Sequence, residues 1–295
     1  MARWRSSSGD GDGGVEDDDG GEDVDGGGAA VRGSAADPAW HGGLTSERAE
    51  CVLCPNPSPM TLDGTNTWLL AEPGSDEVVV VDPGPLDEAH LQHVLRRVAD
   101  SGRRVALTLL THGHADHAEG ADRFHELTGA PVRAFGRGHD DLRAGEAITV
   151  GGLEILAVET PGHTSDSFSF VLPADNTLLT GDTILGRGTT VVAWPDGSLE
   201  AYLASLARIE GLTRAGTVTS LSPGHGPFVA DAAATVTFYL RHRAERLDQV
   251  RDAVARGAHT AYAVVEQVYA DVPRSVWPAA ELSVQAQLEY LREHG

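Results

Sequence analysis

The sequence predicts an α/β (α+β) fold followed by a smaller region of helices alone. Apolar strand-like runs alternate with helical stretches, the alternation starts only after a long Gly/Asp-rich beginning, and it gives way to helices near residue 230. With 295 residues the chain can bury an ample core without disulfides. Its only two cysteines, Cys51 and Cys54, fit a reducing cytoplasm.

Residues 1–40 are predicted to form a disordered acidic tail. From Gly9 to about Asp37 the residues are almost all Gly, Asp, Glu, Ala and Ser, which offer too little apolar surface to offset the entropy of ordering. Arg3 and Arg5 are followed by this polar stretch rather than by the apolar core of a signal peptide, and no apolar run reaches membrane-spanning length. We therefore expect a cytoplasmic protein that does not enter a membrane.

A first domain is expected over residues 41–229. Apolar and β-branched runs bounded by turn residues predict strands at 67–71, 77–82, 104–111, 132–135, 153–159, 167–172, 177–180 and 217–221. Helical periodicity predicts helices at 86–100 and 198–210.

A helical subdomain is expected over residues 230–295. Its predicted helices are 232–256, 260–269 and 276–294, and Pro273 interrupts the run between the last two.

The stretch most informative about chemistry is Thr-His-Gly-His-Ala-Asp-His at residues 111–117, directly after an apolar strand. It holds four potential metal ligands within six residues: His112, His114, Asp116 and His117. Three more candidates also follow apolar strands beside glycine: His163, Asp182 and His225. Imidazole and carboxylate groups are ligands that zinc prefers, and strand ends hold such groups rigidly. Isolated histidines such as His90 and His139 are interpreted as surface or hydrogen-bonded residues.

The pattern H-x-H-x-D-H followed by His, Asp and His resembles the metallo-β-lactamase superfamily. The resemblance implies an αββα sandwich with two zinc ions between the ends of its sheets. It implies His112, His114 and His163 as ligands of the first ion, Asp116, His117 and His225 as ligands of the second, and Asp182 as the bridge.

A narrower resemblance, to the branch that contains β-lactamase-like protein 2 and glyoxalase II-like hydrolases, covers nearly everything after residue 50. It rests on segments 56–68, 81–84, 197–199 and 239–243. In that branch the C-terminal region resembles a small winged-helix domain. Because the sequence stops directly after its last predicted helix, we expect no strands of a wing.

Further residues are expected to support the site. Four residues near the ligands are candidates for orienting the ligating imidazoles: Asp82, Thr111, Thr164 and Thr183. For Asp82, a turn residue of the Asp-Pro-Gly sequence is an equally good interpretation. The resemblance implies that the loop at 56–66, with Met60 and Asn66, borders the active-site mouth, and a plain surface connection is the alternative.

Three functional hypotheses follow. The preferred one is a hydrolase of thioesters or related esters, in which a metal-bound hydroxide is the nucleophile, Asp116 orients it and Asp182 sets the metal spacing. The second is a metal-dependent endoribonuclease acting on single-stranded RNA. The third, a non-catalytic module, is weakest, because a structural zinc needs only four ligands.

Charge favours a small-molecule acyl substrate over RNA. The net charge is −22, and all 22 basic residues are arginine. Such a protein repels phosphates over its surface as a whole, and residues 230–295 carry seven arginines against nine acidic residues. The sequence gives no indication of the oligomeric state.

Overall fold

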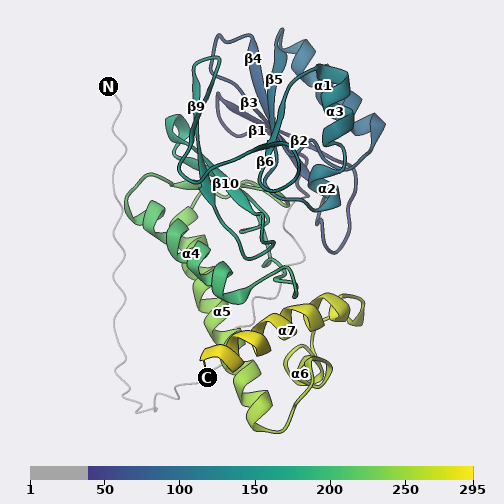
Figure 1. The fold of residues 1–295 in the computed structure, drawn as a ribbon, viewed down its shortest axis with the longest axis vertical. Coiled ribbons are helices and arrows are strands. Elements are labelled where there is room, and N and C mark those ends of the chain that lie inside the picture. Colours follow the sequence, from purple (N-terminus) through teal and green to yellow (C-terminus); the bar gives the residue numbers. More distant parts are fainter. Residues whose placement is uncertain (1–38, 295) are drawn as a thin grey trace, which may run out of the picture. The chain divides into compact units, whose positions relative to one another are not determined.

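A computed structural model describes residues 39–294, which form two β-sheets with helices on their outer faces (Figure 1). The predicted tail, apart from its last two residues, lies outside the described residues. The first sheet has seven strands in the order β1 (Gly43–Leu44), β2 (Ala49–Leu53), β3 (Asn66–Leu70), β4 (Glu77–Val81), β5 (Arg104–Leu109), β6 (Val132–Ala134) and β7 (Asp140–Asp141). The second has five in the order β12 (Ser220–Pro223), β11 (Thr177–Gly181), β10 (Phe168–Leu172), β9 (Leu153–Glu159) and β8 (Ala147–Val150).

The helices divide between the two sheets and the C-terminal region. On or between the strands lie α1 (Glu88–Asp100), α2 (Ala115–Ala118), α3 (Ala121–Thr128), the 3-10 turn η1 (Pro173–Asp175) and α4 (Leu199–Arg214). After the last strand come α5 (Ala232–Ala255), α6 (Ala261–Val268), the 3-10 turn η2 (Arg274–Val276) and α7 (Trp277–His294).

Side-chain alternation along the strands explains the layers. In β4, Val79 and Val81 join the core between the two sheets, whereas Val78 and Val80 point to the other face, where α1 and α3 pack. In β10, Phe170 faces the same central core. Because successive strand residues point to opposite faces, each sheet needs a helical layer outside it. The order of layers is therefore αββα, as the resemblance to the metallo-β-lactamase superfamily implied.

Helix α5 links the second sheet to the C-terminal helices. Near its start, Val236 and Tyr239 pack against the outer face of the second sheet together with α4. Near its end, Val250 and Ala253 pack with α6 and α7 in a separate cluster. Within residues 39–294 no strand follows Pro223, so the described C-terminal region is helical, as expected. The domain boundary near residue 230 stays a prediction.

No helix of the described residues combines the length and the apolar character that crossing a membrane requires.

Several element boundaries differ from the prediction, and the end of α4 lies four residues beyond the expected one. Two of the differences have a clear local reason. Helix α1 begins two residues later than expected because the side chain of Asp87 caps it, accepting hydrogen bonds from the backbone N–H groups of Ala89 and His90. Strand β12 begins three residues late, because the backbone N–H of Thr217 is bonded to Leu212 at the end of α4. The short helices α2 and α3 were not predicted.

Candidate metal centre

The first four candidate ligands lie at the end of β5, where the chain enters α2. His112 is buried and His114 immediately precedes the helix, which carries Asp116 and His117. Two hydrogen bonds hold this start of the helix, from the N–H groups of His117 and Ala118 to the carbonyl of His114. A rigid turn therefore places all four side chains at one edge of the sheet.

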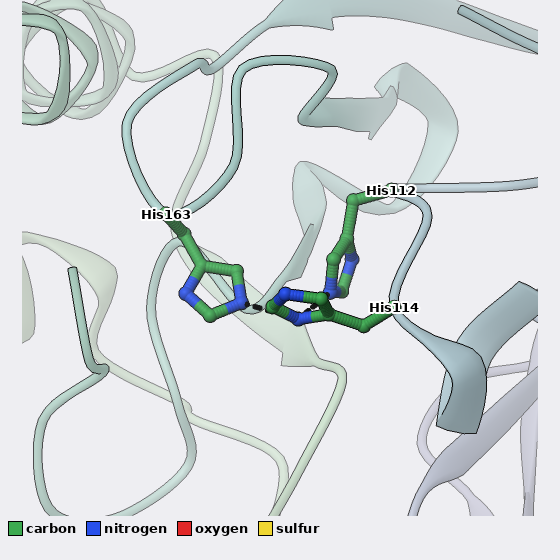
Figure 2. Close-up of side chains that lie close together, drawn as sticks. All are labelled: His112, His114 and His163. Atoms are coloured by element: carbon green, nitrogen blue, oxygen red, sulfur yellow. Dashed lines mark hydrogen bonds between the residues drawn. The ribbon is translucent and has the colours of Figure 1, made fainter. Parts of the chain in front are cut away.

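The second sheet brings His163 to the same place from the loop after β9. Its Nε2 lies 3.1 Å from Nδ1 of His114, and Nε2 of His112 lies 3.1 Å from that same Nδ1 (Figure 2). Three ring nitrogens thus point at one another from two loops. A ring nitrogen that offers a lone pair repels another one, so a cation between them accounts for this convergence.

A second cluster forms where β12 ends. Nε2 of His225 lies 3.2 Å from Nε2 of His117 and 3.2 Å from Oδ2 of Asp116. The same Asp116 oxygen is 3.4 Å from Nε2 of His117. This cluster shares no residue with the one around His114.

Asp182, at the end of β11, lies between the two clusters. Its Oδ2 is 3.6 Å from Nε2 of His163 and 3.3 Å from Nε2 of His225, and its Oδ1 is 3.4 Å from Nε2 of His117. That Oδ1 is buried and has no hydrogen-bond partner. A buried carboxylate oxygen without a donor is costly, which indicates that a cation belongs beside it.

The donor set fits divalent metal ions. Three groups within the described residues could each hold one, with ligand atoms no more than 4.8 Å apart: His112, His114 and His163; His112, His117 and Asp182; and Asp116, His117 and His225. Two of the groups use every predicted ligand except Asp182, which the remaining group contains. Nitrogen and carboxylate oxygen donors in this number suit zinc.

The directions of the pKa shifts divide the buried histidines into two groups. Burial lowers the pKa of His112 and of His163, so both rings stay neutral and can donate a lone pair. Burial opposes protonation of His117 and His225 too, but Asp182 outweighs it and raises the pKa of His225 to about 9 and that of His117 well above its ordinary value. The carboxylates there thus favour positive charge, which a metal ion would provide.

Each buried ring is oriented by a hydrogen bond at its other nitrogen. Nδ1 of His117 donates to Asp82 at 2.9 Å, and Nδ1 of His225 donates to the carbonyl of Gly64 at 3.1 Å. The hydroxyl of Thr111 lies 3.0 Å from Nδ1 of His112 and itself donates to Asp82 at 2.7 Å. With Nδ1 protonated in this way, Nε2 of each ring carries the lone pair that faces the centre.

His163 is held by the backbone of another loop. Its Nδ1 lies 2.6 Å from the carbonyl of Val191 and 3.2 Å from the hydroxyl of Thr190. The two remaining candidates for orienting rings bond elsewhere: Thr164 to the hydroxyl of Ser167 at 2.6 Å, and Thr183 to the carbonyl of Thr160 at 3.5 Å. The first bond stays within the loop that carries His163, and the second joins that loop to the one that carries Asp182.

The residues expected at the mouth differ in their positions. Met60 is half exposed, whereas Asn66 is fully buried. The amide of Asn66 donates to the carbonyls of Pro223 and Gly226 at 2.9 Å each, and its oxygen accepts from Nε1 of Trp40 at 2.8 Å. Asn66 therefore fixes the loop that carries His225. Because its side chain is buried and fully engaged in these bonds, it is not placed to contact a substrate.

Two further residues that shape the candidate centre were not predicted from the sequence. Thr65 donates from its hydroxyl to Oδ2 of Asp116 at 3.1 Å, and its place beside Asn66 in the 56–68 segment was the available signal. Gly224 permits close packing, because a Cβ there would lie 2.5 Å from Oδ1 of Asp182 and 2.7 Å from Cε1 of His117.

Comparisons with known proteins agree with this geometry. Residues 60–138 and 134–219 match the model of the metallo-beta-lactamase superfamily, and residues 260–295 match that of the beta-lactamase associated winged helix domain. A beta-lactamase-like protein 2 homolog of Caenorhabditis elegans is 31% identical over 262 residues, 85% of this chain and 86% of the relative. An atrochrysone carboxyl ACP thioesterase of Aspergillus chevalieri is 32% identical over 238 residues, 76% of this chain and 74% of the relative.

Solved structures support the fold. A beta-lactamase domain protein from Burkholderia ambifaria superposes with a TM-score of 0.73 at 24% identity, covering 89% of this chain and 91% of that one. A metallo-beta-lactamase family protein from Thermus thermophilus gives 0.71, also at 24% identity, and covers 84% and 94% of the two chains.

Proposed function

The chain belongs to the metallo-β-lactamase superfamily of hydrolases, and on that premise we propose that it hydrolyses thioesters or related esters of small acyl groups with two zinc ions. The observation that carries the proposal is the position of Asp182 between two clusters of convergent ligand atoms, with one buried oxygen left without a donor. A single-ion site would not require a carboxylate there.

The expected chemistry needs no side-chain nucleophile, and the seven candidate ligands include neither serine nor cysteine. Two bound cations would supply Lewis acidity and lower the pKa of a shared water toward neutrality. The residues of the chain position the reactants and hold protons.

Asp116 is suited to orient the attacking water. Its side chain is 28% exposed, against 11% for Asp182, so it is the more accessible carboxylate. Burial works against ionisation of Asp116, but the hydrogen bond with His225 and the charge of His117 lower its pKa to about 2, so Oδ2 accepts hydrogen bonds at neutral pH. The Thr65 hydroxyl fixes that oxygen. Asp182, held more deeply, would set the spacing of the two ions.

The choice of a thioester rests on the named thioesterase relative and on charge. The relative from Aspergillus chevalieri is a thioesterase by name, and the match covers three quarters of both chains. A net charge of −22 opposes binding of a polyanion such as RNA.

Hydrolysis by zinc-reconstituted protein tests the proposal. The substrates are a panel of acyl thioesters and a labelled single-stranded RNA, and the variants are His114→Ala and Asp182→Asn, with the exposed His93→Ala as the matched control. We expect thioester turnover that falls to background in the two site variants and is unchanged in the control. RNA cleavage without thioester turnover, lost in the same two variants, would replace this proposal with the ribonuclease alternative.

A further inference from the structure

Arg243, on the inner side of α5, is a buried cation without an acidic partner. It is 7% exposed, and the described residues, 39–294, place no carboxylate within ion-pair distance of its guanidinium. Its Nη2 donates to the carbonyl of Thr190 at 2.6 Å, its Cζ lies over the ring of Tyr202, 4.8 Å from the ring centroid, and its Nε has no hydrogen-bond partner. Burying an unpaired charge is costly, so this arrangement requires a reason.

The carbonyl that Arg243 holds belongs to the segment behind a candidate ligand. The hydroxyl of Thr190 lies 3.2 Å from Nδ1 of His163, and the next carbonyl, that of Val191, accepts a hydrogen bond from the same nitrogen at 2.6 Å. Both acceptors that orient the ring therefore lie within two residues of the Arg243 contact.

Helix α7 holds the same segment further along. The N–H of Val192 donates to the hydroxyl of Ser283 at 3.3 Å, and the N–H of Trp194 donates to the carbonyl of Leu282 at 3.3 Å. Residues 190–194 thus lie between His163 and the C-terminal helices α5 and α7, which adjoin each other in Figure 1.

The loop that carries Asp182 is held from the same side. The hydroxyl of Tyr202, under the Arg243 guanidinium, donates to the carbonyl of Thr183 at 2.7 Å. The hydroxyl of Tyr239, one helical turn before Arg243, accepts from the N–H of Leu185 at 2.8 Å. Arg243 therefore touches the supports of two ligand-bearing loops.

We propose that Arg243 is a positioning residue for the metal centre. By holding the Thr190 carbonyl it fixes the oxygens that orient His163, and so it couples the C-terminal helices to the ligand group His112, His114 and His163. The inference rests on the proposed function only in requiring that this group bind a metal ion.

Cobalt binding tests the coupling without substrate. Metal-free protein is titrated with Co²⁺, and affinity and the visible absorption spectrum are recorded for the wild type and for Arg243→Met, Arg243→Lys and Thr190→Val. We expect Arg243→Met to weaken binding at the His112, His114 and His163 group roughly tenfold to a hundredfold and to change its absorption, because partners that orient a ligating ring contribute that much. The group of Asp116, His117 and His225 should bind Co²⁺ with the same affinity as in the wild type.

The other variants separate positioning from general stability. A lysine can still donate one hydrogen bond to the Thr190 carbonyl, so Arg243→Lys should recover part of the affinity. Thr190→Val removes only the hydroxyl near His163 and should weaken the same group. Arg241→Met, two residues away on the same helix with a side chain 66% exposed, should match the wild type.

Each outcome decides the question. Wild-type cobalt binding and spectra in a folded Arg243→Met protein would overturn the inference while leaving the proposed function intact. A wild-type protein that binds no cobalt would overturn both. If Arg243→Met does not fold, unchanged cobalt binding in both Arg243→Lys and Thr190→Val would overturn the inference instead.

Discussion

Asp82 accepts a hydrogen bond from Nδ1 of His117 at 2.9 Å, while the same carboxylate accepts both the N–H and the hydroxyl of Thr111, at 2.8 and 2.7 Å. Asp82 has a left-handed backbone with φ of 54°, at the turn after β4. Aspartate tolerates this conformation better than most residues do. One side chain can therefore serve both as the turn residue and as the orienting residue, and it joins the ends of β4 and β5.

Asp82→Asn should weaken zinc binding roughly tenfold to a hundredfold without unfolding the protein, because an amide nitrogen cannot accept from Nδ1 of His117. That nitrogen would replace Oδ2, which accepts from both His117 and the hydroxyl of Thr111, so two of the three bonds are lost as they stand and the ring is free to turn. Competition with a chromophoric chelator measures the affinity. Asp122→Asn, at an exposed aspartate of α3, is the matched control, and equal affinities in both variants would argue against an orienting role for Asp82.

Gly224→Ala should lower zinc content sharply. The added Cβ would lie 2.5 Å from Oδ1 of Asp182 and 2.7 Å from Cε1 of His117, which forces apart two candidate ligands. Gly211→Ala is the control, because nothing lies within 4 Å of its Cβ and alanine in a helix is favoured by about 0.5–1 kcal/mol. Metal analysis after dialysis gives the readout. Full zinc content in Gly224→Ala would mean that the centre tolerates the methyl group.

The free energy of unfolding should fall in mild acid because the buried His90 becomes protonated. Burial lowers the folded-state pKa of this histidine to about 4 from 6.5. Protonation thus favours the unfolded state, so the stabilisation is complete above pH 6.5 and is lost as the pH falls from there toward 4. Between about pH 7 and pH 5 the loss should be about 2 kcal/mol.

Urea unfolding at the two pH values, compared between the wild type and His90→Gln, measures this contribution. Glutamine can keep a polar contact with the Thr67 hydroxyl, which lies 2.9 Å from Nε2 of His90, but it does not titrate. His93→Gln, at an exposed position of the same helix, should retain most of the wild-type pH dependence, because burial is the largest cause of the lowered pKa of His90 and the charge of His93 is a smaller one. The same loss of stability in His90→Gln would assign the acid sensitivity to other groups.

The sequence alone was enough to propose the candidate ligands, because the pattern that marks them is local. His112, His163, Asp182 and His225 each follow an apolar strand, and strand ends meet at one edge of a layered sheet. Their neighbours in space were harder to predict. Arg243 lies in the segment 239–243 that carries the narrower resemblance, but it is 80 residues from His163 and acts through a backbone carbonyl, so the segment did not reveal its role.

Burial was the other quantity that the sequence did not specify. Asn66 and Met60 both fall in the stretch 56–66 that was expected to be a loop, yet Asn66 begins β3 and is enclosed by the carbonyls of Pro223 and Gly226, whereas Met60 is half exposed. The short helix α2 also escaped prediction, since four residues are too few for a helical period to appear.

Met60 offers a test of the proposed acyl specificity. It lies on a loop held by the ion pair of Asp63 with Arg187, at 2.5 Å, and by the hydrogen bond from His225 to the carbonyl of Gly64, so its half-exposed side chain stands on a loop that is bonded to a candidate ligand. Burial of such a side chain against an acyl chain contributes about 1.5–3 kcal/mol. Met60→Ala should therefore raise KM for a long-chain thioester roughly tenfold, with kcat and zinc content unchanged.

Steady-state kinetics on thioesters of increasing chain length check the Met60 prediction. The increase in KM should grow with chain length, because a longer acyl group has more surface to lose. Leu44→Ala, at a residue of β1 that is 76% exposed, removes an equally apolar side chain and should leave KM unchanged. An increase in KM that is the same for acetyl and long-chain thioesters would show that Met60 acts on the loop and not on the acyl group.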